Sequence, residues 1–475
     1  MKISDIKDIV WEKDVEEFEK WYNAQLEIET FITNRNPLTK LFTKHSANVL
    51  ILNTQYYYDR TGFKWDEDRD RTLQKRPLTL LTKLILKTKQ YIKTIKRIAK
   101  DLEETKKVDG ASLQKFRELF FLIWCIFMAD LGKPLASLIQ KRLEKRGLNP
   151  RQIDTIINYC ISFRNAFEFQ KEAEGLKKIY RHLPQQYKAN SVVFKTLPQS
   201  IQNTILTHWK KYRHLTGAWL DTRPETPPEL FRRLLMMGKT QSPKRIQKIP
   251  KRLQQFLSKD DLQLISLTRQ HSFFDNYVSD IYERLDFLLN QHLSKQFSIT
   301  SKDLSWYSFD ELEALTKYGK KLTNQQREQR KQYRIMVQVD GKVTMFYGKR
   351  NFEEVQKAIS GKLPLLTATT TLKGFTASRG FIRAPVKIVN QTKDMNKVKT
   401  GDILVATMTH PDLMLAIQKC SGIITDAGGI TSHAAIISRE FRIPCIVGTR
   451  IATKVLKDGN LVELDANNGT VLIIS

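Results

Sequence analysis

The stretch TDAGGITSHAAIISREFRIPCIVG, residues 425 to 448, indicates an α/β fold. A glycine pair and two hydroxyl residues precede His433, and the run HAAIISREF that starts there has the apolar spacing of a helix. The segment PCIVG that follows is a short apolar run, typical of a buried strand. Loop, helix and strand therefore follow one another closely, as they do in an α/β unit.

Short β-rich runs surround this stretch from about Leu363 to the end of the chain. Turn residues and helical segments separate them, which is the alternation of an α/β domain. These runs are APVKIV, DILVATM, SGIITD, PCIVG and LVELD. We therefore expect an α/β domain over residues 363–475.

The chain before residue 300 has the apolar spacing of helices. Apolar residues recur at helical intervals over residues 80–102, beside lysines that we interpret as solvated, and again over 261–293. The run LFFLIWCIFMA, residues 119–129, predicts a buried helix, since crossing a bilayer needs about 20 residues. GLNP at 147–150 and DTRPETPPEL at 221–230 are expected to be helix ends or loops.

A connecting segment follows these helices. SFDE at 308–311 has the form of a helix-capping box, and YRIMVQVDGKVTMFYG at 333–348 predicts a hairpin that turns at Asp340 and Gly341. The sequence thus predicts a multidomain protein. We expect a mostly α-helical N-terminal module over 1–305, a connecting helix, hairpin and hinge over 306–362, and the C-terminal α/β domain over 363–475.

The composition indicates a folded protein with an unusual charge. The four cysteines lack metal-ligand spacing, which fits buried thiols in a reducing compartment, and no secretion signal or membrane span is recognised, so we expect a cytoplasmic protein. The formal net charge is +29, and most of it lies in the helical part. A nucleic acid or a nucleotide would suit this charge, but no nucleic-acid-binding motif accompanies it, and solvated lysine-rich faces are the favoured interpretation.

The residues before His433 suit an anion. Gly428 and Gly429 let backbone N–H groups approach an anion closely, while Thr431 and Ser432 supply hydroxyls that can cap a helix. A phosphoryl group on His433 would lie near a helix N-terminus, where free N–H groups and the dipole favour negative charge. Because a neutral imidazole is nucleophilic at cellular pH, the segment suits a phosphoryl carrier.

Other interpretations of this histidine fit less well. A serine-hydrolase elbow needs a Gly-x-Ser-x-Gly turn, which is absent from this stretch. A metal site would need further ligands nearby, and only Asp426 is close in sequence. A structural histidine remains the simplest alternative.

The wider pattern resembles the swivelling phosphohistidine domain of phosphoenolpyruvate-utilising enzymes, such as pyruvate phosphate dikinase, phosphoenolpyruvate synthase and rifampicin phosphotransferase. The segments that carry the resemblance are GGITSHAAIISRE, IPCIVGT, LKDGNLVELDANNGTV, GFTASRGFIRAPVKIV and VKTGDILVATMTHPDLMLAIQKCSGIITD. The resemblance implies that His433 is the phosphorylated residue and that Gly428, Gly429, Thr431 and Ser432 form its loop. It also implies a domain that swings about a hinge between residues 350 and 375.

Other residues can be placed by the same resemblance. Thr409 and Pro411, in THPDLM, match a segment that lies near the histidine loop in this family. Arg439 and Glu440 fall in the helix after His433, where we expect them to fix packing. His410 matches no motif and is expected to be a surface or packing residue.

The parts that would supply the phosphoryl group are not recognisable in this sequence. Phosphoryl transfer needs Mg²⁺, acidic ligands and basic groups around the donor, and the first 350 residues contain no Walker loop and no motif of an ATP-grasp module. We therefore expect no metal or cofactor site by motif here. Mg²⁺ and ATP or phosphoenolpyruvate are expected on a separate ATP-grasp or phosphoenolpyruvate-binding partner.

The helical module is similar in its position to the acceptor-binding domain of rifampicin phosphotransferase, and its acceptor is an unknown small molecule. Its densest polar and aromatic cluster predicts a candidate acceptor pocket of five residues: Arg213, His214, Trp219, Asp221 and Arg223. A second cluster at helical spacing is better explained by intrahelical pairing: Arg269, Asn276, Tyr277, Asp280 and Arg284.

Two functions remain open from the sequence. The chain is either a dikinase-like phosphotransferase component, incomplete without a nucleotide-binding partner, or a non-catalytic interaction protein descended from such an enzyme. The second would bind nucleic acid or a protein through its basic helices. The intact GGITSH loop favours the first, because a scaffold has no need of a histidine there.

Overall fold

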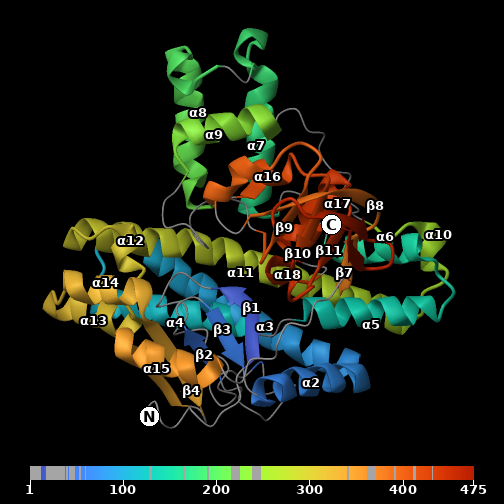
Figure 1. Ribbon diagram of the computed structural model, residues 1–475, viewed down its shortest axis with the longest axis horizontal. Coiled ribbons are helices and arrows are strands. Elements are labelled where there is room, and N and C mark those ends of the chain that lie inside the picture. The colour runs from blue at the N-terminus through green and yellow to red at the C-terminus, as the bar shows by residue number, and fades with distance from the viewer. Residues whose placement is uncertain are drawn as a thin grey trace. The chain divides into compact units, whose positions relative to one another are not determined.

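In the computed structural model, the chain forms two compact units (Figure 1). One unit combines Met1–Leu148 with Phe256–Thr367, and the other combines Asn149–Gln255 with Ala368–Ser475. The described residues are 12–17, 38, 41, 49–52, 55–58, 60–127, 131–161, 163, 166–189, 192–215, 225–237, 248–339, 342–360, 371–389, 392–409, 413–429 and 432–474. The predicted three-part division at residues 305 and 362 stays a prediction, and the compact units divide the chain at other points.

The first unit contains the predicted helical stripes. Its helices are α2 (Arg60–Lys75), α3 (Pro77–Glu103), α4 (Gly110–Phe127), α5 (Gly132–Glu144), α11 (Lys259–Phe297), α12 (Ser301–Leu304), α13 (Phe309–Tyr318), α14 (Asn324–Gln332) and α15 (Lys349–Ser360). The capping box is confirmed, since Ser308 accepts from the Glu311 N–H and Glu311 accepts from the Ser308 N–H. The apolar run in α4 is buried, as predicted.

This unit also has a five-stranded antiparallel sheet. Its order is β1-β3-β2-β4-β5, from β1 (Glu12–Glu17), β2 (Val49–Leu52), β3 (Gln55–Tyr58), β4 (Arg334–Val339) and β5 (Lys342–Tyr347). The hairpin of β4 and β5 was predicted, with Asp340 and Gly341 lying outside the described residues. The expectation of a mostly helical N-terminal region misses β1, β2 and β3. They are short, and β2 pairs with β4 across almost 300 residues, a contact that local patterns do not reveal.

The second unit contains the histidine. Its elements before residue 256 are α6 (Pro150–Ile161), α7 (Glu168–His182), η3 (Gln185–Tyr187), η4 (Phe194–Thr196), α8 (Gln199–Tyr212), η5 (Arg213–Leu215), α9 (Pro227–Met237) and α10 (Lys251–Gln254). α9 overlaps the stretch 221–230, which was expected to be a helix end or a loop. That expectation was wrong from Pro227 onward, because proline is well tolerated in the first turn of a helix. Residues 221–224 lie outside the described residues.

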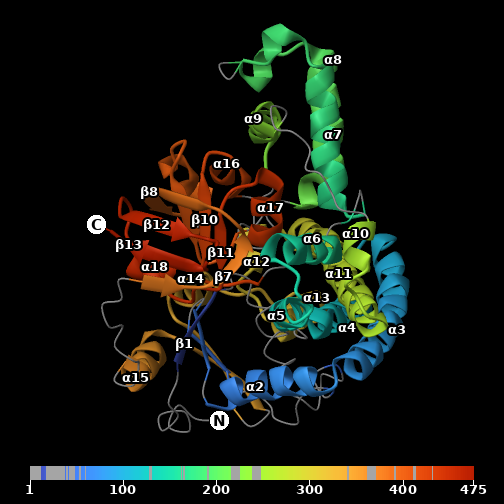
Figure 2. The same ribbon diagram turned by 90° about the vertical axis from the view of Figure 1, so that its right-hand side faces the viewer.

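The rest of the second unit is the predicted α/β domain. Its eight-stranded sheet has the order β6-β13-β12-β8-β9-β10-β11-β7, and β8 to β11 are parallel (Figure 2). The strands are β6 (Thr371–Lys373), β7 (Phe375–Ser378), β8 (Phe381–Ile388), β9 (Ile403–Ala406), β10 (Gly422–Thr425), β11 (Cys445–Val447), β12 (Leu461–Asp465) and β13 (Thr470–Ile473). The helices are η6 (Thr392–Lys397), α16 (Met414–Ile417), α17 (His433–Phe441) and α18 (Ala452–Val455).

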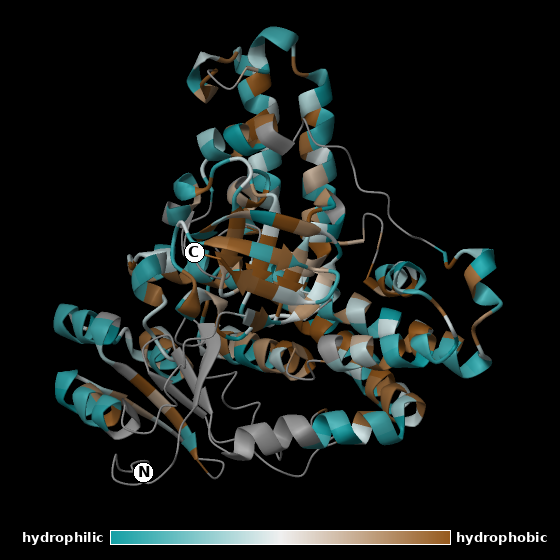
Figure 3. Cartoon of the chain, turned by 45° about the vertical axis from the view of Figure 1, so that its right-hand side comes forward, coloured by the Kyte–Doolittle hydropathy of each residue, from teal (hydrophilic) through white to brown (hydrophobic). Residues whose placement is uncertain are grey.

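Both faces of the central strands are buried, which explains their unbroken apolar runs (Figure 3). On one face, Leu404 and Ile423 pack with α16 and α17, and on the other, Val405 and Ile424 pack with α18. The carboxyl end of β10 leads into the histidine loop, so the sheet fixes where that loop begins. The four cysteines are free and buried, as expected. No helix in the described part of the chain is long and apolar enough to span a membrane.

Candidate functional site

His433 is the first residue of α17, as its sequence predicts. Ser432 is the N-cap, in an extended conformation, and its hydroxyl accepts a hydrogen bond from the Ala435 N–H at 3.4 Å. The Ser432 N–H in turn donates to the carbonyl of Gly429 at 3.0 Å. Thr431, the other predicted hydroxyl of the loop, lies outside the described residues. His433 therefore starts a capped helix, at the end where the helix dipole favours negative charge.

Thr409 lies beside the ring of His433. Its Oγ1 is 3.0 Å from Nδ1 of His433, and Thr409 itself is buried with 7% of its surface exposed. β9 ends three residues before Thr409, so two different strands of the sheet deliver the two side chains. Of the pair Thr409 and Pro411, the structure brings Thr409 to the histidine, while Pro411 and His410 lie outside the described residues.

Gly428 has a backbone conformation that the loop needs. Its φ is +93°, and a Cβ there would come within 2.9 Å of the Cβ and 3.0 Å of the Oγ of Ser432. Any side chain at this position would therefore press on the residue that caps α17. The glycine both permits the turn after β10 and leaves room for the cap.

Asp426 fastens the loop to the segment after β11. Its carboxylate accepts from the Thr449 hydroxyl at 3.0 Å and from the Thr453 N–H and hydroxyl, at the start of α18. Burial raises the pKa of Asp426, although the hydrogen bonds from Thr453 and Thr449 oppose that shift. These threonines carry no sequence signal that would have marked them beforehand. Both carboxylate oxygens have protein donors, so this side chain supports the loop.

Arg439 lies one turn and a half beyond His433, on α17. Burial lowers its pKa to about 10, and the charges of Cys445 and Asp154 oppose that shift. Asp154, on α6, also accepts a hydrogen bond from Arg379 at 2.7 Å. The role of Arg439 in packing stays a prediction, and the side chain of Glu440 lies outside the described residues.

The candidate acceptor pocket is only partly described. His214 is buried, with Nε2 2.6 Å from the Glu168 carboxylate, and the guanidinium of Arg213 lies over the Trp209 ring at 5.0 Å. The other three predicted residues, Trp219, Asp221 and Arg223, lie outside the described residues.

Three helices of this unit pack through an apolar cluster and a buried ion network. Leu176 of α7, Ile205 of α8 and Leu234 of α9 belong to the cluster, and Met414 of α16 packs against it. Arg233 lies between two carboxylates, 2.7 Å from Glu172 and 2.9 Å from Glu225.

The network shifts the pKa of its members. Burial would raise the pKa of Glu172, but the charge and hydrogen bonds of Arg233 outweigh it, so the pKa is lowered. His208 Nε2 lies 3.6 Å from the same carboxylate. Among the described residues, no group of three or more His, Cys, Asp or Glu side chains could hold a metal ion.

Comparison with known proteins identifies the C-terminal region. Residues 398–469 match the family described as PEP-utilising enzyme, mobile domain. The probable phosphoenolpyruvate synthase of Archaeoglobus fulgidus is 47% identical over 119 residues, which is 25% of this chain and 15% of that protein. The phosphoenolpyruvate synthase of Pyrococcus furiosus is 50% identical over 104 residues, 22% of this chain and 13% of that protein.

A Bacillus subtilis protein described as an uncharacterized phosphotransferase, YvkC, is 43% identical over 102 residues, 22% of this chain and 12% of that protein. The chain thus spans between 12% and 15% of the length of these three relatives. The resemblance inferred from the sequence is confirmed for the C-terminal region, where residues 398–469 match the mobile domain of PEP-utilising enzymes.

Proposed function

Since the C-terminal region is a PEP-utilising mobile domain, we propose that the chain is a phosphotransferase component in which His433 carries the phosphoryl group. The observation that carries the proposal is the position of His433 at the capped start of α17, with Nδ1 3.0 Å from Thr409. A helix N-terminus stabilises a phosphoryl group, and the capped loop holds the ring in place. Gly428, Gly429, Thr431 and Ser432 form the loop around it in this proposal.

The contact with Thr409 indicates which ring nitrogen reacts. Because Thr409 Oγ1 takes the Nδ1 side of the imidazole, the phosphoryl group attaches to Nε2. In the reactive tautomer Nδ1–H donates to Thr409, and the Nε2 lone pair attacks the phosphorus while the bond to the leaving group breaks. The ring becomes positively charged, and the Thr409 oxygen stabilises the Nδ1–H proton. Transfer to the acceptor reverses these steps.

The donor and the acceptor bind outside the histidine domain in this proposal. Two of the relatives that match this domain are named probable phosphoenolpyruvate synthase and phosphoenolpyruvate synthase, which supports a donor related to phosphoenolpyruvate. Mg²⁺ with ATP or phosphoenolpyruvate would be held on a separate partner. The helical module would present the small-molecule acceptor, with Arg213, His214, Trp219, Asp221 and Arg223 as the candidate pocket. A protein of this kind acts in the cytoplasm.

The competing function is a non-catalytic interaction protein derived from such an enzyme. It would keep the fold of the α/β domain but would have no use for a reactive imidazole. A labelling experiment separates the two. Wild type and His433→Ala are incubated with γ-labelled ATP, β-labelled ATP or labelled phosphoenolpyruvate, with and without lysate of the source organism.

We expect acid-labile, alkali-stable label on the wild type and none on His433→Ala, and only when lysate is present. The nucleotide or phosphoenolpyruvate that delivers the label identifies the donor. Label that appears on His433→Ala as strongly as on the wild type would overturn the assignment of His433.

A further inference from the structure

We call the described residues that carry α7, α8 and α9, namely 168–189, 192–215 and 225–237, the α7–α9 module. Most of its acidic side chains are paired within the module, whereas many of its basic side chains are exposed. Four of its five described acidic residues have donors within the module. Glu168 pairs with His214, Glu172 and Glu225 pair with Arg233, and Glu229 accepts from Thr226. The remaining acidic residue is Glu174, which is exposed.

The basic residues of the module have the opposite distribution. On α7, Lys171, Lys178 and Arg181 are exposed. On η4, α8 and α9, Lys195, Lys210, Lys211 and Arg232 are exposed as well. Among the described residues of the module, seven cations and one carboxylate are thus exposed, so this part of the chain presents a positive surface to solvent.

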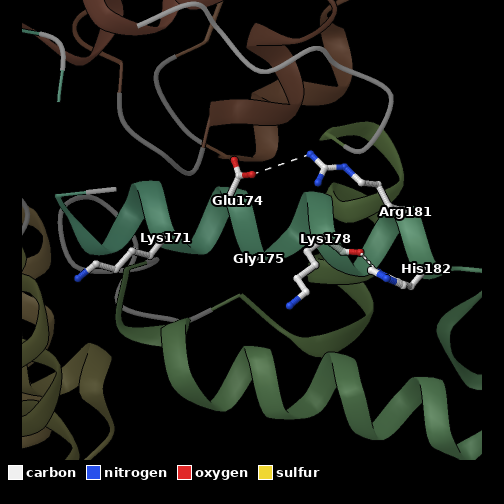
Figure 4. A pocket seen from close by; sticks show the side chains of 6 residues that line it. All are labelled: Lys171, Glu174, Gly175, Lys178, Arg181 and His182. Carbon is white, nitrogen blue, oxygen red and sulfur yellow. Dashed lines mark hydrogen bonds and ion pairs between the residues drawn. The ribbon is translucent and has the colours of Figure 1, made fainter. Parts of the chain in front are cut away.

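The cations of α7 line a hollow of about 360 Å³ on one face of that helix (Figure 4). Lys171 and Lys178 extend to the same side of the helix, away from Glu174, and no ion pair involves either lysine among the described residues. Arg181 is 3.9 Å from Glu174, a weak pair because both side chains are about half exposed or more. Glu174, Gly175 and His182 complete the lining, and the Nδ1–H of His182 donates to the Lys178 carbonyl at 2.8 Å. The face therefore keeps most of its positive charge available for a ligand.

Two further observations decide what kind of anion fits. The cations lie on all three helices and on a connection between them, a spread that suits a polymer with a charge at every repeat. Protein interfaces have an apolar centre, and Val193 is the only large hydrophobic side chain exposed in the described part of the module. No aromatic side chain of the described module is exposed either, so it offers no platform for stacking bases.

We propose that the α7–α9 module binds the phosphate backbone of nucleic acid, without recognition of base sequence. Lysines dominate the exposed cations, and as point charges they contact phosphates without reading base edges. This binding goes beyond the phosphoryl transfer by His433 and does not depend on it. It also gives part of the positive charge of the chain a function that sequence patterns alone did not favour.

The test uses the full chain and a fluorescein-labelled DNA duplex of about 20 base pairs, with the salt varied from about 50 to 200 mM. The variant replaces Lys171, Lys178 and Arg181 by glutamine. A control variant replaces Lys89, Lys93 and Lys100 of α3, which are also exposed, and changes the net charge equally. Helical circular dichroism verifies that both variants fold.

We expect the α7 variant to bind the duplex at least tenfold more weakly at about 100 mM salt. The slope of log K against log salt should become less steep by about 2 to 3, since each lost phosphate contact removes about 0.9 from its magnitude. The control should lose less than about threefold in affinity, and two duplexes of unrelated sequence should bind alike. The phosphorylation of His433 should be unchanged in the α7 variant, which keeps this test separate from the phosphoryl-transfer proposal.

Equal losses in both variants would overturn the assignment to α7, because net charge alone would then explain the binding. Absence of binding by the wild type at about 100 mM salt would overturn the proposal outright and favour an acidic protein as the partner of the module.

Discussion

Replacement of Thr409 by valine tests the contact that orients the imidazole. Valine has nearly the same shape as threonine, so the buried position stays filled, but it has no oxygen to meet Nδ1 of His433. The intended loss is one hydrogen bond of 3.0 Å between neutral groups, where Thr409 is 7% exposed. Such a bond contributes about 1 kcal/mol, which at 25 °C corresponds to about a fivefold change in an equilibrium.

The fivefold change should appear in two measurements. The fraction of His433 rings that carry the proton on Nδ1 should fall, as read from the nitrogen chemical shifts of the imidazole. The rate of phosphorylation by phosphoramidate, a small donor that needs no partner protein, should fall about fivefold at about pH 8, where an ordinary imidazole is neutral. Thr409→Ser keeps the oxygen and should stay within about twofold of the wild type.

Equal labelling rates for Thr409→Val and the wild type would refute the reasoning, because the threonine would then neither orient the ring nor stabilise its proton. A Thr409→Ser variant as slow as Thr409→Val would also contradict it, since packing would then explain the loss.

Three further changes probe the loop and the buried ion network. Gly428→Ala places a Cβ at a φ of +93° and close to Ser432, so it should destabilise the protein by about 1–2 kcal/mol. It should also slow the phosphoramidate labelling of His433, and an unchanged melting temperature would contradict this prediction. Arg233→Met removes the arginine that pairs with the carboxylates of Glu172 and Glu225, and it should cost about 3–5 kcal/mol at pH 7 in urea unfolding. The loss should be smaller at about pH 5, where those carboxylates can bind protons; an equal loss at both pH values would contradict this. The pKa of Glu172 is lowered in the folded protein, so its contribution to stability is fully present above the unfolded value of about 4.3. This contribution is lost as the pH falls through the lower folded pKa. The free energy of unfolding should therefore fall more steeply with decreasing pH in the wild type than in Glu172→Gln, and equal slopes would contradict this.

Much of the C-terminal domain could be predicted because its signals are local. The glycines, the capping serine and the helix that starts at His433 lie within a dozen residues, and the strands are apolar runs because both of their faces are buried. The contact between Thr409 and His433 was harder to predict, since 24 residues separate the two and only the sheet brings them together.

The features that sequence reasoning missed depend on distant parts of the chain. β1 has the charged sequence EKDVEE, which has no apolar alternation, and it pairs with β3 about 40 residues later. The grouping of residues 149–255 with the histidine domain rests on contacts such as the ion pair of Asp154 with Arg379, 225 residues apart. The pairing of four acidic residues within the α7–α9 module likewise depends on tertiary contacts, for which composition gives no sign.

The central claim is that one imidazole nitrogen of this chain carries the phosphoryl group. The most direct measurement treats the purified full-length protein with phosphoramidate, digests it under alkaline conditions, and locates the phosphoryl group by mass spectrometry and by phosphorus–proton couplings in the labelled peptide. The account predicts one phosphoryl group per chain, on Nε2 of His433, and far slower labelling of the exposed histidines such as His182. Label spread evenly over the histidines, or label on Nδ1 of His433, would contradict it.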